Sequence, residues 1–305
     1  MKVNLIETNN LSKQYNNFIV VNKVNMHVPE GSIYGFVGEN GSGKTTIMRL
    51  ITGLANPTSG TITLFGMSSK DKEVNEKRKK ISAIVENAAL VSTLTAIQNM
   101  QYQELYEGIR LTDEERQELL RKVHLENTGN KKVKNFSLGM KQRLAIALSL
   151  MKKPNLMLLD EPMNGLDPEG IVELRELLIE LNRNDGITIL ISSHILSELE
   201  KIASCYGFIS HGKLIEELTA EELQNKCRKS LSIKVDNVEK AKDVLHSIGI
   251  DNATYSTNGE IKIFDEIRIA DLVMQLEKNR VDVLAINSND ESVEDYYLNL
   301  TKGAL

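Results

Sequence analysis

The sequence has few cysteines, no tryptophan and no long apolar run. Its two cysteines, Cys205 and Cys227, are too few and too far apart for a disulfide or metal framework, so a reducing interior suits them. No stretch approaches the roughly 18 apolar residues that a membrane-spanning helix needs, and LAIALSLM at 144–151 comes nearest. The N-terminal MKVNLIETNN lacks the apolar core of a secretion signal. These absences predict a cytosolic globular protein with no direct membrane span.

An excess of positive charge is also absent. The 37 Lys and Arg residues are outnumbered by 42 Asp and Glu residues, which gives a formal net charge of −5. Nucleic-acid binding depends on a basic surface, so we expect no nucleic-acid partner. The 305 residues can form one large domain or two ordinary ones, and an apolar content of 41% is typical of a folded protein.

Apolar patterning divides the chain into two parts. Over 1–225, apolar strands alternate with amphipathic helices, which predicts an α/β domain with a parallel sheet, and helical patterns dominate a subdomain at about 87–150. Over 226–305 the order is strand, helix, two strands, helix, strand and a last helix. That order predicts a small α+β domain of the split-βαβ type.

The segment GENGSGKT at 38–45 matches the phosphate-binding loop pattern G-x-x-x-x-G-K-[ST] and lies between a predicted strand and a predicted helix. Gly41 and Gly43 allow the backbone to approach phosphate, Lys44 can neutralise its charge, and the Thr45 hydroxyl can bind Mg²⁺. A glycine-rich turn before a helix is the simpler alternative. We expect ATP contacts from Gly38, Glu39, Asn40, Gly41, Ser42, Gly43, Lys44, Thr45 and Thr46.

Two further strand ends carry groups that such a loop requires. LMLLDEP at 156–162 ends a buried run with Asp160, a candidate Mg²⁺ ligand, and Glu161, which can polarise a water molecule. A strand edge that happens to carry two acids is the alternative. His194 ends the neighbouring strand ITILISS, and ends of parallel strands converge on a ligand, so His194 can reach a γ-phosphate. A solvent-facing histidine is the alternative there.

With these motifs, FSLGMKQR at 136–143 makes residues 3 to 225 resemble the nucleotide-binding subunits of ABC transporters, whose signature reads LSGGQ-x-QR. Leu138 and Met140 depart from that pattern, as in drug, bacitracin and lantibiotic exporters, whereas Ser137 and Gly139 keep it. The resemblance implies a P-loop ABC ATPase core with a mixed sheet, two subunits packed head to tail around ATP, and separate membrane permease subunits. The implied trans ATP contacts are Ser137, Leu138, Gly139 and Met140.

The resemblance assigns further roles. It implies that Tyr15 stacks on adenine with Val20 beneath it, that Asp167 in NGLD faces the partner subunit, and that His194 is the switch histidine. Glu86 in IVEN stands where relatives commonly carry a Mg²⁺-contacting glutamine, so Thr45, Glu86 and Asp160 are the expected metal ligands. A solvated strand end is the alternative for Glu86.

The ending SVEDYYLNLTKG at 292–303 also resembles drug and bacitracin exporters. We therefore expect an ATPase of a peptide-antibiotic or lantibiotic exporter, acting as a homodimer or heterodimer at the cytoplasmic face of the plasma membrane. An importer subunit and a soluble ABC ATPase without a transport role are the alternatives.

Overall fold

The structure is a computed structural model that describes residues 3–85, 89–227, 230–256, 259–289 and 292–302. Glu86, a predicted metal ligand, lies outside the described residues. The chain divides into two compact units. The first unit comprises the residues up to Ala220 together with those from Thr301 onward, and the second unit is Glu221–Leu300. Each unit is described by itself.

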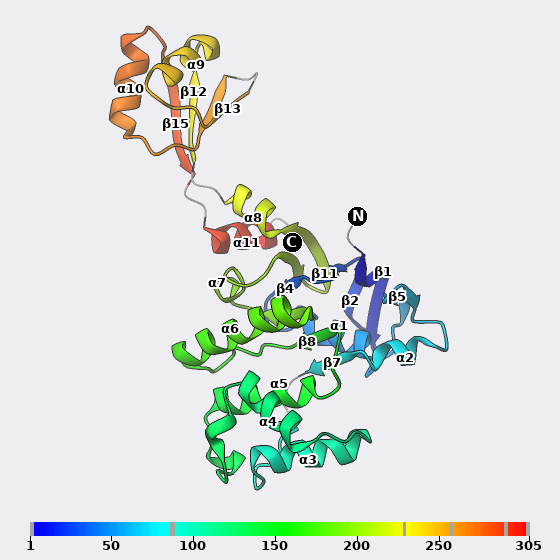
Figure 1. The fold of residues 1–305 in the computed structure, drawn as a ribbon. Coiled ribbons are helices and arrows are strands. Elements are labelled where there is room, and N and C mark those ends of the chain that lie inside the picture. The colour runs from blue at the N-terminus through cyan, green and yellow to red at the C-terminus, as the bar shows by residue number, and fades with distance from the viewer. Residues whose placement is uncertain (1–2, 86–88, 228–229, 257–258, 290–291, 303–305) are drawn as a thin grey trace. The chain divides into compact units, whose positions relative to one another are not determined.

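A mostly parallel sheet forms the centre of the first unit (Figure 1). Its strand order is β11-β10-β4-β9-β8-β7, and only β11 runs antiparallel to its neighbour among these described pairs. The strands are β4 (Ile33–Val37), β7 (Ile81–Ile84), β8 (Leu156–Leu159), β9 (Thr188–Ser193), β10 (Cys205–Ser210) and β11 (Lys213–Thr219). Every residue of β4, β8 and β9 is buried, which explains their continuous apolar runs.

A second, antiparallel sheet packs against the same core. It contains β1 (Asn4–Tyr15), β2 (Phe18–Val24), β3 (His27–Pro29), β5 (Ser59–Leu64) and β6 (Met67–Ser68), and a short helix, α2 (Val74–Arg78), follows. Helix α1 (Lys44–Thr52) shares one apolar cluster with both sheets, to which it contributes Ile47, Met48, Leu50 and Ile51. The helix that follows the phosphate loop is therefore held by side chains from both sheets.

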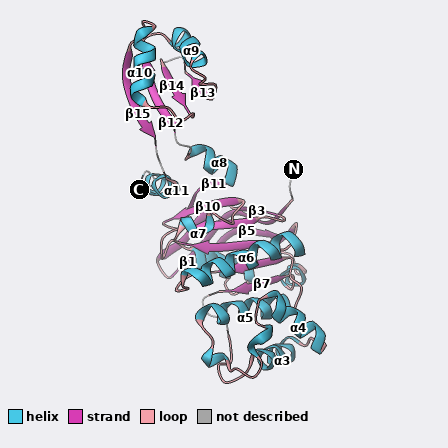
Figure 2. Cartoon of the chain, turned by 60° about the vertical axis from the view of Figure 1, so that its left-hand side comes forward, coloured by secondary structure: helices cyan, strands magenta, loops and turns pink. Residues whose placement is uncertain are grey.

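Helices between β7 and β8 in the chain form a helical region, grouped together in Figure 2. They are α3 (Ala96–Glu107), α4 (Asp113–Lys122), α5 (Leu138–Leu150) and two 3₁₀ turns, Glu126–Thr128 and Val133–Asn135. Capping boxes formed by Thr95 with Gln98 and by Thr112 with Glu115 fix the starts of α3 and α4. Three more helices follow before the sheet of the second unit: α6 (Pro168–Asp185), α7 (Leu196–Leu199) and α8 (Ala220–Lys226).

The second unit has the predicted order of strands and helices. Its elements are β12 (Ser230–Val235), α9 (Val238–Ser247), β13 (Ala253–Tyr255), β14 (Glu260–Ile263), α10 (Ile269–Lys278), β15 (Val283–Asn289) and α11 (Val293–Lys302). The antiparallel sheet order β13-β14-β12-β15 is that of a split-βαβ sandwich, as the sequence predicts. Leu245, Leu272 and Leu276 of α9 and α10 pack on one face of the sheet. Within the described residues, no helix is both long and apolar enough to cross a bilayer.

Candidate nucleotide site

The phosphate loop connects β4 to α1 in a conformation that only its glycines allow. Gly41 and Gly43 have φ values of 82° and 110°, in the left-handed region that side chains disfavour. A Cβ at Gly38 would lie 2.6 Å from both the Ile209 carbonyl oxygen and Ser42 Oγ. The loop is therefore closely packed, and its amides and the start of α1 form the kind of backbone that binds phosphate.

Lys44 extends across this loop and is only 5% exposed. Its Nζ donates hydrogen bonds to the carbonyl oxygens of Gly38 at 2.6 Å and Glu39 at 3.1 Å. Ser42 Oγ is buried and has no hydrogen-bond partner among the described residues. A buried hydroxyl without a partner is costly, and a bound phosphate oxygen would satisfy it. The loop thus fits a triphosphate.

Asp160, Thr45 and Ser192 form a hydrogen-bonded cluster at the ends of β8 and β9. Thr45 Oγ1 donates to Asp160 Oδ2 at 2.6 Å, and Ser192 Oγ donates to Asp160 Oδ1 at 2.6 Å. A carboxylate beside a hydroxyl is the donor set that Mg²⁺ uses in phosphate-loop enzymes. The structure therefore brings two of the three predicted metal ligands together, and the site fits Mg²⁺.

Glu161 lies next to this cluster and contacts two predicted site residues. Its Oε1 is 3.1 Å from Lys44 Nζ, an ion pair without hydrogen-bond geometry, and its Oε2 is 2.8 Å from His194 Nδ1. The Glu161 backbone is left-handed, with φ of 49°, and its N–H donates to Ser192 Oγ at 2.9 Å. Glu161 is thus oriented both through its backbone and through its side chain.

Ser192 is the residue of this site that sequence reasoning missed. Its hydroxyl joins the Asp160 carboxylate to the Glu161 backbone, and the side chain is fully buried. The available signal was its position in ITILISSH, two residues before His194 on the strand beside the one that ends in Asp160. A serine in a buried strand is common, so the signal is weak without the strand register.

The predicted adenine contacts lie on the β1–β2 hairpin. The Val20 carbonyl oxygen is 2.9 Å from the position that a Cβ on Gly43 would take, so β2 borders the phosphate loop. Tyr15 ends β1, is 44% exposed, and has Lys13 Nζ 4.7 Å from its ring centroid. The Tyr15 side chain is thus partly exposed, and its stacking on adenine stays a prediction.

Two of the predicted partner-facing residues are helix N-caps. Ser137 Oγ accepts a hydrogen bond from the Met140 N–H at 3.2 Å at the start of α5, and Asp167 Oδ1 accepts one from the Gly170 N–H at 3.1 Å at the start of α6. Ser137 is exposed, and because its oxygen is the acceptor, its own O–H is available to donate to an anion.

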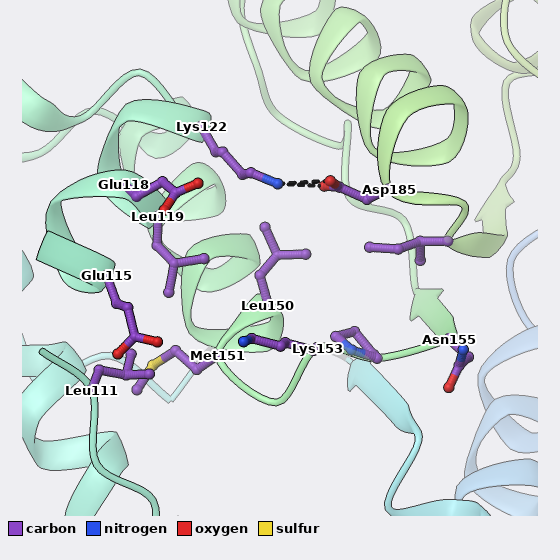
Figure 3. A pocket seen from close by; sticks show the side chains of 12 residues that line it. Leu111, Glu115, Glu118, Leu119, Lys122, Leu150, Met151, Lys153, Asn155 and Asp185 are labelled. Carbon is purple, nitrogen blue, oxygen red and sulfur yellow. Dashed lines mark hydrogen bonds and ion pairs between the residues drawn. The ribbon is translucent and has the colours of Figure 1, made fainter.

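A separate cavity of about 400 Å³ lies among α4, the end of α5 and the end of α6 (Figure 3). Lys122 and Asp185 form an ion pair at its edge, with Nζ and Oδ2 2.7 Å apart. Asn155, which precedes β8, and Ile187, which precedes β9, line it. It therefore lies at the opposite ends of these strands from Asp160 and His194, and it is not the nucleotide site.

Comparison with known proteins decides the family. A family model described as ABC transporter matches residues 21–164. The bacitracin transport ATP-binding protein BcrA of Enterococcus faecalis is 40% identical over 301 residues, which cover 98% of this chain and 97% of that protein. This chain belongs to the ABC transporter family. The resemblance seen in its motifs is confirmed, and so is the predicted activity of the family, ATP hydrolysis.

Other relatives and solved structures agree. The lantibiotic transport ATP-binding protein SrtF of Streptococcus pyogenes is 44% identical over 221 residues, which cover 72% of this ABC chain and 93% of that protein. A dimeric ATP-binding cassette in a post-hydrolysis state with ADP and phosphate has 27% identity and a TM-score of 0.62, and the match covers 70% of this chain and 98% of the cassette. The predicted α/β P-loop core is confirmed.

Proposed function

We propose that this chain is the ATP-hydrolysing subunit of an exporter that moves a peptide antibiotic, a lantibiotic or a similar amphipathic molecule through separate membrane subunits. The observation that carries the proposal is the match to the bacitracin transport ATP-binding protein, which extends over 98% of the chain and so includes the second unit. The bacitracin protein of Bacillus licheniformis matches over the same share, at 39% identity. The first unit alone is a general ATPase fold, so the second unit makes the match more specific.

The residues of the site would have separate roles in ATP hydrolysis. The loop amides, Ser42 and Lys44 would hold the phosphates, and Thr45 and Asp160 would hold Mg²⁺, which supplies positive charge to the phosphate oxygens when bound. Glu161 would accept a proton from the attacking water. His194 would keep the Glu161 carboxylate in place, since the two are in direct contact. Glu86 remains a predicted third metal ligand.

Dimerisation would complete the site. Ser137 is exposed at the start of α5, where the N-terminal dipole of the helix favours an anion, and Asp167 caps the start of α6. We propose that a second ATPase subunit offers the same residues, with Leu138, Gly139 and Met140, to the ATP held by the phosphate loop of the first. The similar cassette solved as a dimer supports this arrangement.

A groove in the first unit offers a surface for the membrane subunit. It is about 370 Å³ in volume, and Leu54, Val85, Gln103 and Glu107 are among the residues that line it. On the adjoining face of α3, Tyr102, Leu105 and Tyr106 are 54%, 85% and 79% exposed. Exposed apolar side chains at such spacing form one stripe of a helix and mark an interaction surface. Through this contact the chain would sit at the cytoplasmic face of the plasma membrane.

The second unit would be accessory, because each predicted phosphate contact lies in the first. We propose a domain boundary near residue 225, close to the division between Ala220 and Glu221. A chain that ends near residue 225 is therefore expected to bind ATP with the affinity of the full chain, as measured by titration with a fluorescent ATP analogue. Loss of affinity in a truncated chain with a native circular dichroism spectrum would contradict this boundary.

Export of a peptide antibiotic is tested in the host cell. Deletion of the gene should lower the concentration of bacitracin or lantibiotic that stops growth, and the wild-type gene should restore resistance. The matched control is the gene with Glu161→Gln, which should be expressed but should not restore resistance because hydrolysis is lost. Unchanged susceptibility to every membrane-active peptide in the deletion strain, or full resistance with Glu161→Gln, would refute the exporter proposal.

A further inference from the structure

Leu138, at the first position of α5, packs against a loop that carries Glu161. The leucine side chain is 50% exposed, and its buried part lies against Gly165. A methyl group added at the Gly165 Cα would lie 3.2 Å from Leu138 Cδ2, closer than the roughly 3.5–4.0 Å of an unstrained carbon contact. Leu138 therefore occupies the space that a side chain at residue 165 would need.

The surrounding contacts join the start of α5 to the start of α6. A Cβ on Gly139 would lie 3.8 Å from Leu166 Cδ2 and 3.9 Å from the Gly170 Cα, which is ordinary packing. One turn further along, Arg143 of α5 forms an ion pair of 3.3 Å with Glu173 of α6. The first turns of the two helices therefore enclose the loop at residues 161–167 from one side.

This loop is a succession of tight turns that begins at Glu161. The Asn164 N–H donates to the Glu161 carbonyl oxygen at 3.1 Å, and the Leu166 N–H donates to the Met163 carbonyl oxygen at 3.2 Å. Glu161 itself has a φ of 49°, a conformation that persists only where neighbouring groups hold it. A shift of the backbone at Gly165 would thus reach the Glu161 backbone through a single hydrogen-bonded turn.

We propose that Leu138 is a positioning residue for ATP hydrolysis. Through its contact with Gly165 it holds the loop at residues 161–167 in the conformation that directs the Glu161 carboxylate at the attacking water. This inference rests on the proposed role of Glu161. It differs from the predicted contact of Leu138 with the ATP of a partner subunit, because it acts within one chain through Gly165, so the effects of variants at residues 138 and 165 should be coupled.

The test is a set of variants of the full-length chain, assayed for steady-state ATP hydrolysis. Leu138→Ala is expected to lower kcat about five- to tenfold and to change the KM for ATP less than about twofold, since misorientation of a catalytic group acts on the chemical step. Leu138→Met keeps the side-chain volume and should retain most of the kcat. The matched control is Leu284→Ala on β15, a leucine that is 61% exposed, which should change neither constant.

A double-mutant cycle asks whether Leu138 acts through Gly165. Gly165→Ala should lower kcat for two reasons, because residue 165 has a φ of 77° that a side chain disfavours and because the new methyl group meets Leu138. The backbone strain is the same in both backgrounds and cancels in the cycle. In the Leu138→Ala background that clash is absent, so the combined variant should keep a kcat at least about threefold above the product of the two single effects, as coupled sites do. Multiplicative effects, an unchanged kcat for Leu138→Ala, or a rise in KM alone would overturn the proposal. Glu161→Gln in the same series tests the role of Glu161 separately, since a wild-type rate there would refute that role whatever Leu138 does.

Discussion

Removal of the Ser192 hydroxyl is the sharpest test of how the acidic pair is held. In Ser192→Ala, Asp160 Oδ1 loses its 2.6 Å donor, and the Glu161 N–H loses its 2.9 Å acceptor. A hydrogen bond to a charged group contributes about 1.5–3 kcal/mol, and an unsatisfied buried amide costs about 1–3 kcal/mol. Because Ser192 is fully buried, water cannot replace either bond without a rearrangement. We expect a loss of about 2.5–6 kcal/mol in the free energy of unfolding.

The functional consequence of Ser192→Ala should be separate from this loss of stability. Without the serine hydroxyl, the left-handed Glu161 backbone loses the hydrogen bond that ties it to β9, so the carboxylate loses part of its orientation. Misplacement of a catalytic group by about 1 Å can lower the rate about 10²-fold. We expect kcat to fall by about 10- to 100-fold, while the KM for ATP stays near its wild-type value because Lys44 and the phosphate loop are unchanged.

Thr188→Val on the same strand provides the control. Thr188 is also fully buried, and its Oγ1 accepts a hydrogen bond from the Gly31 N–H at 2.8 Å at the opposite end of β9. Its loss should cost about 0.5–1.5 kcal/mol of stability without changing kcat, because Gly31 is exposed and its N–H can bond to water. Urea unfolding and ATPase assays on both variants measure these effects. Equal loss of kcat in the two variants, or a wild-type kcat in Ser192→Ala, would refute the reasoning.

Four further predictions each concern a single side chain. Lys44→Ala should weaken ATP binding, as measured by calorimetry. Glu161→Gln should still bind ATP, should hydrolyse it about 10²-fold or more slowly, and should elute from a size-exclusion column as a dimer when ATP is present. A Glu161→Gln monomer in the presence of ATP would count against ATP-driven dimerisation. The hydrogen bond from Arg116 lowers the pKa of Glu104. Glu104→Gln should therefore cost about 3 kcal/mol at neutral pH, and this cost should shrink as the pH falls through the lowered pKa. A cost that does not change with pH in urea unfolding would contradict this prediction. Glu86→Ala should lower transport-coupled hydrolysis across Mg²⁺ concentrations more than Glu86→Gln does, and coincident curves would make Glu86 a solvated strand end.

Local patterns in the chain were sufficient for the framework of the site. Gly41, Gly43 and Lys44 belong to one contiguous motif, and the conformation of a loop between a buried strand and a helix depends mainly on its own residues. The apolar runs that end in Asp160 and His194 predicted strand ends at one edge of a parallel sheet. The structure places Asp160 beside Thr45, and His194 beside Glu161. The order of elements in the second unit was equally readable, because the periodicity changes at each boundary.

Contacts between side chains of neighbouring helices and loops could not be predicted from local sequence patterns. The side chains of Glu104 and Arg116 form a nearly buried ion pair between α3 and α4, and Leu138 meets Gly165 between two helices. In the sequence, Glu104, Arg116 and Leu138 fit ordinary polar or apolar positions on a helix, and Gly165 fits an ordinary turn. Their partners depend on how the helices pack, which the spacing of residues along one helix does not specify.

Ser192 illustrates the difference between what the sequence determined and what only the tertiary structure decided. The sequence by itself determined that two acids follow β8 and that a histidine follows β9, because a continuous apolar run and the polar residues after it can be read from the order of residues alone. Only the tertiary structure decided that Leu159 stands opposite Ile191, which brings Ser192 beside Asp160. A shift of one residue in that register would turn the serine to the other face of the sheet, so its role depends on strand pairing and not on either strand alone.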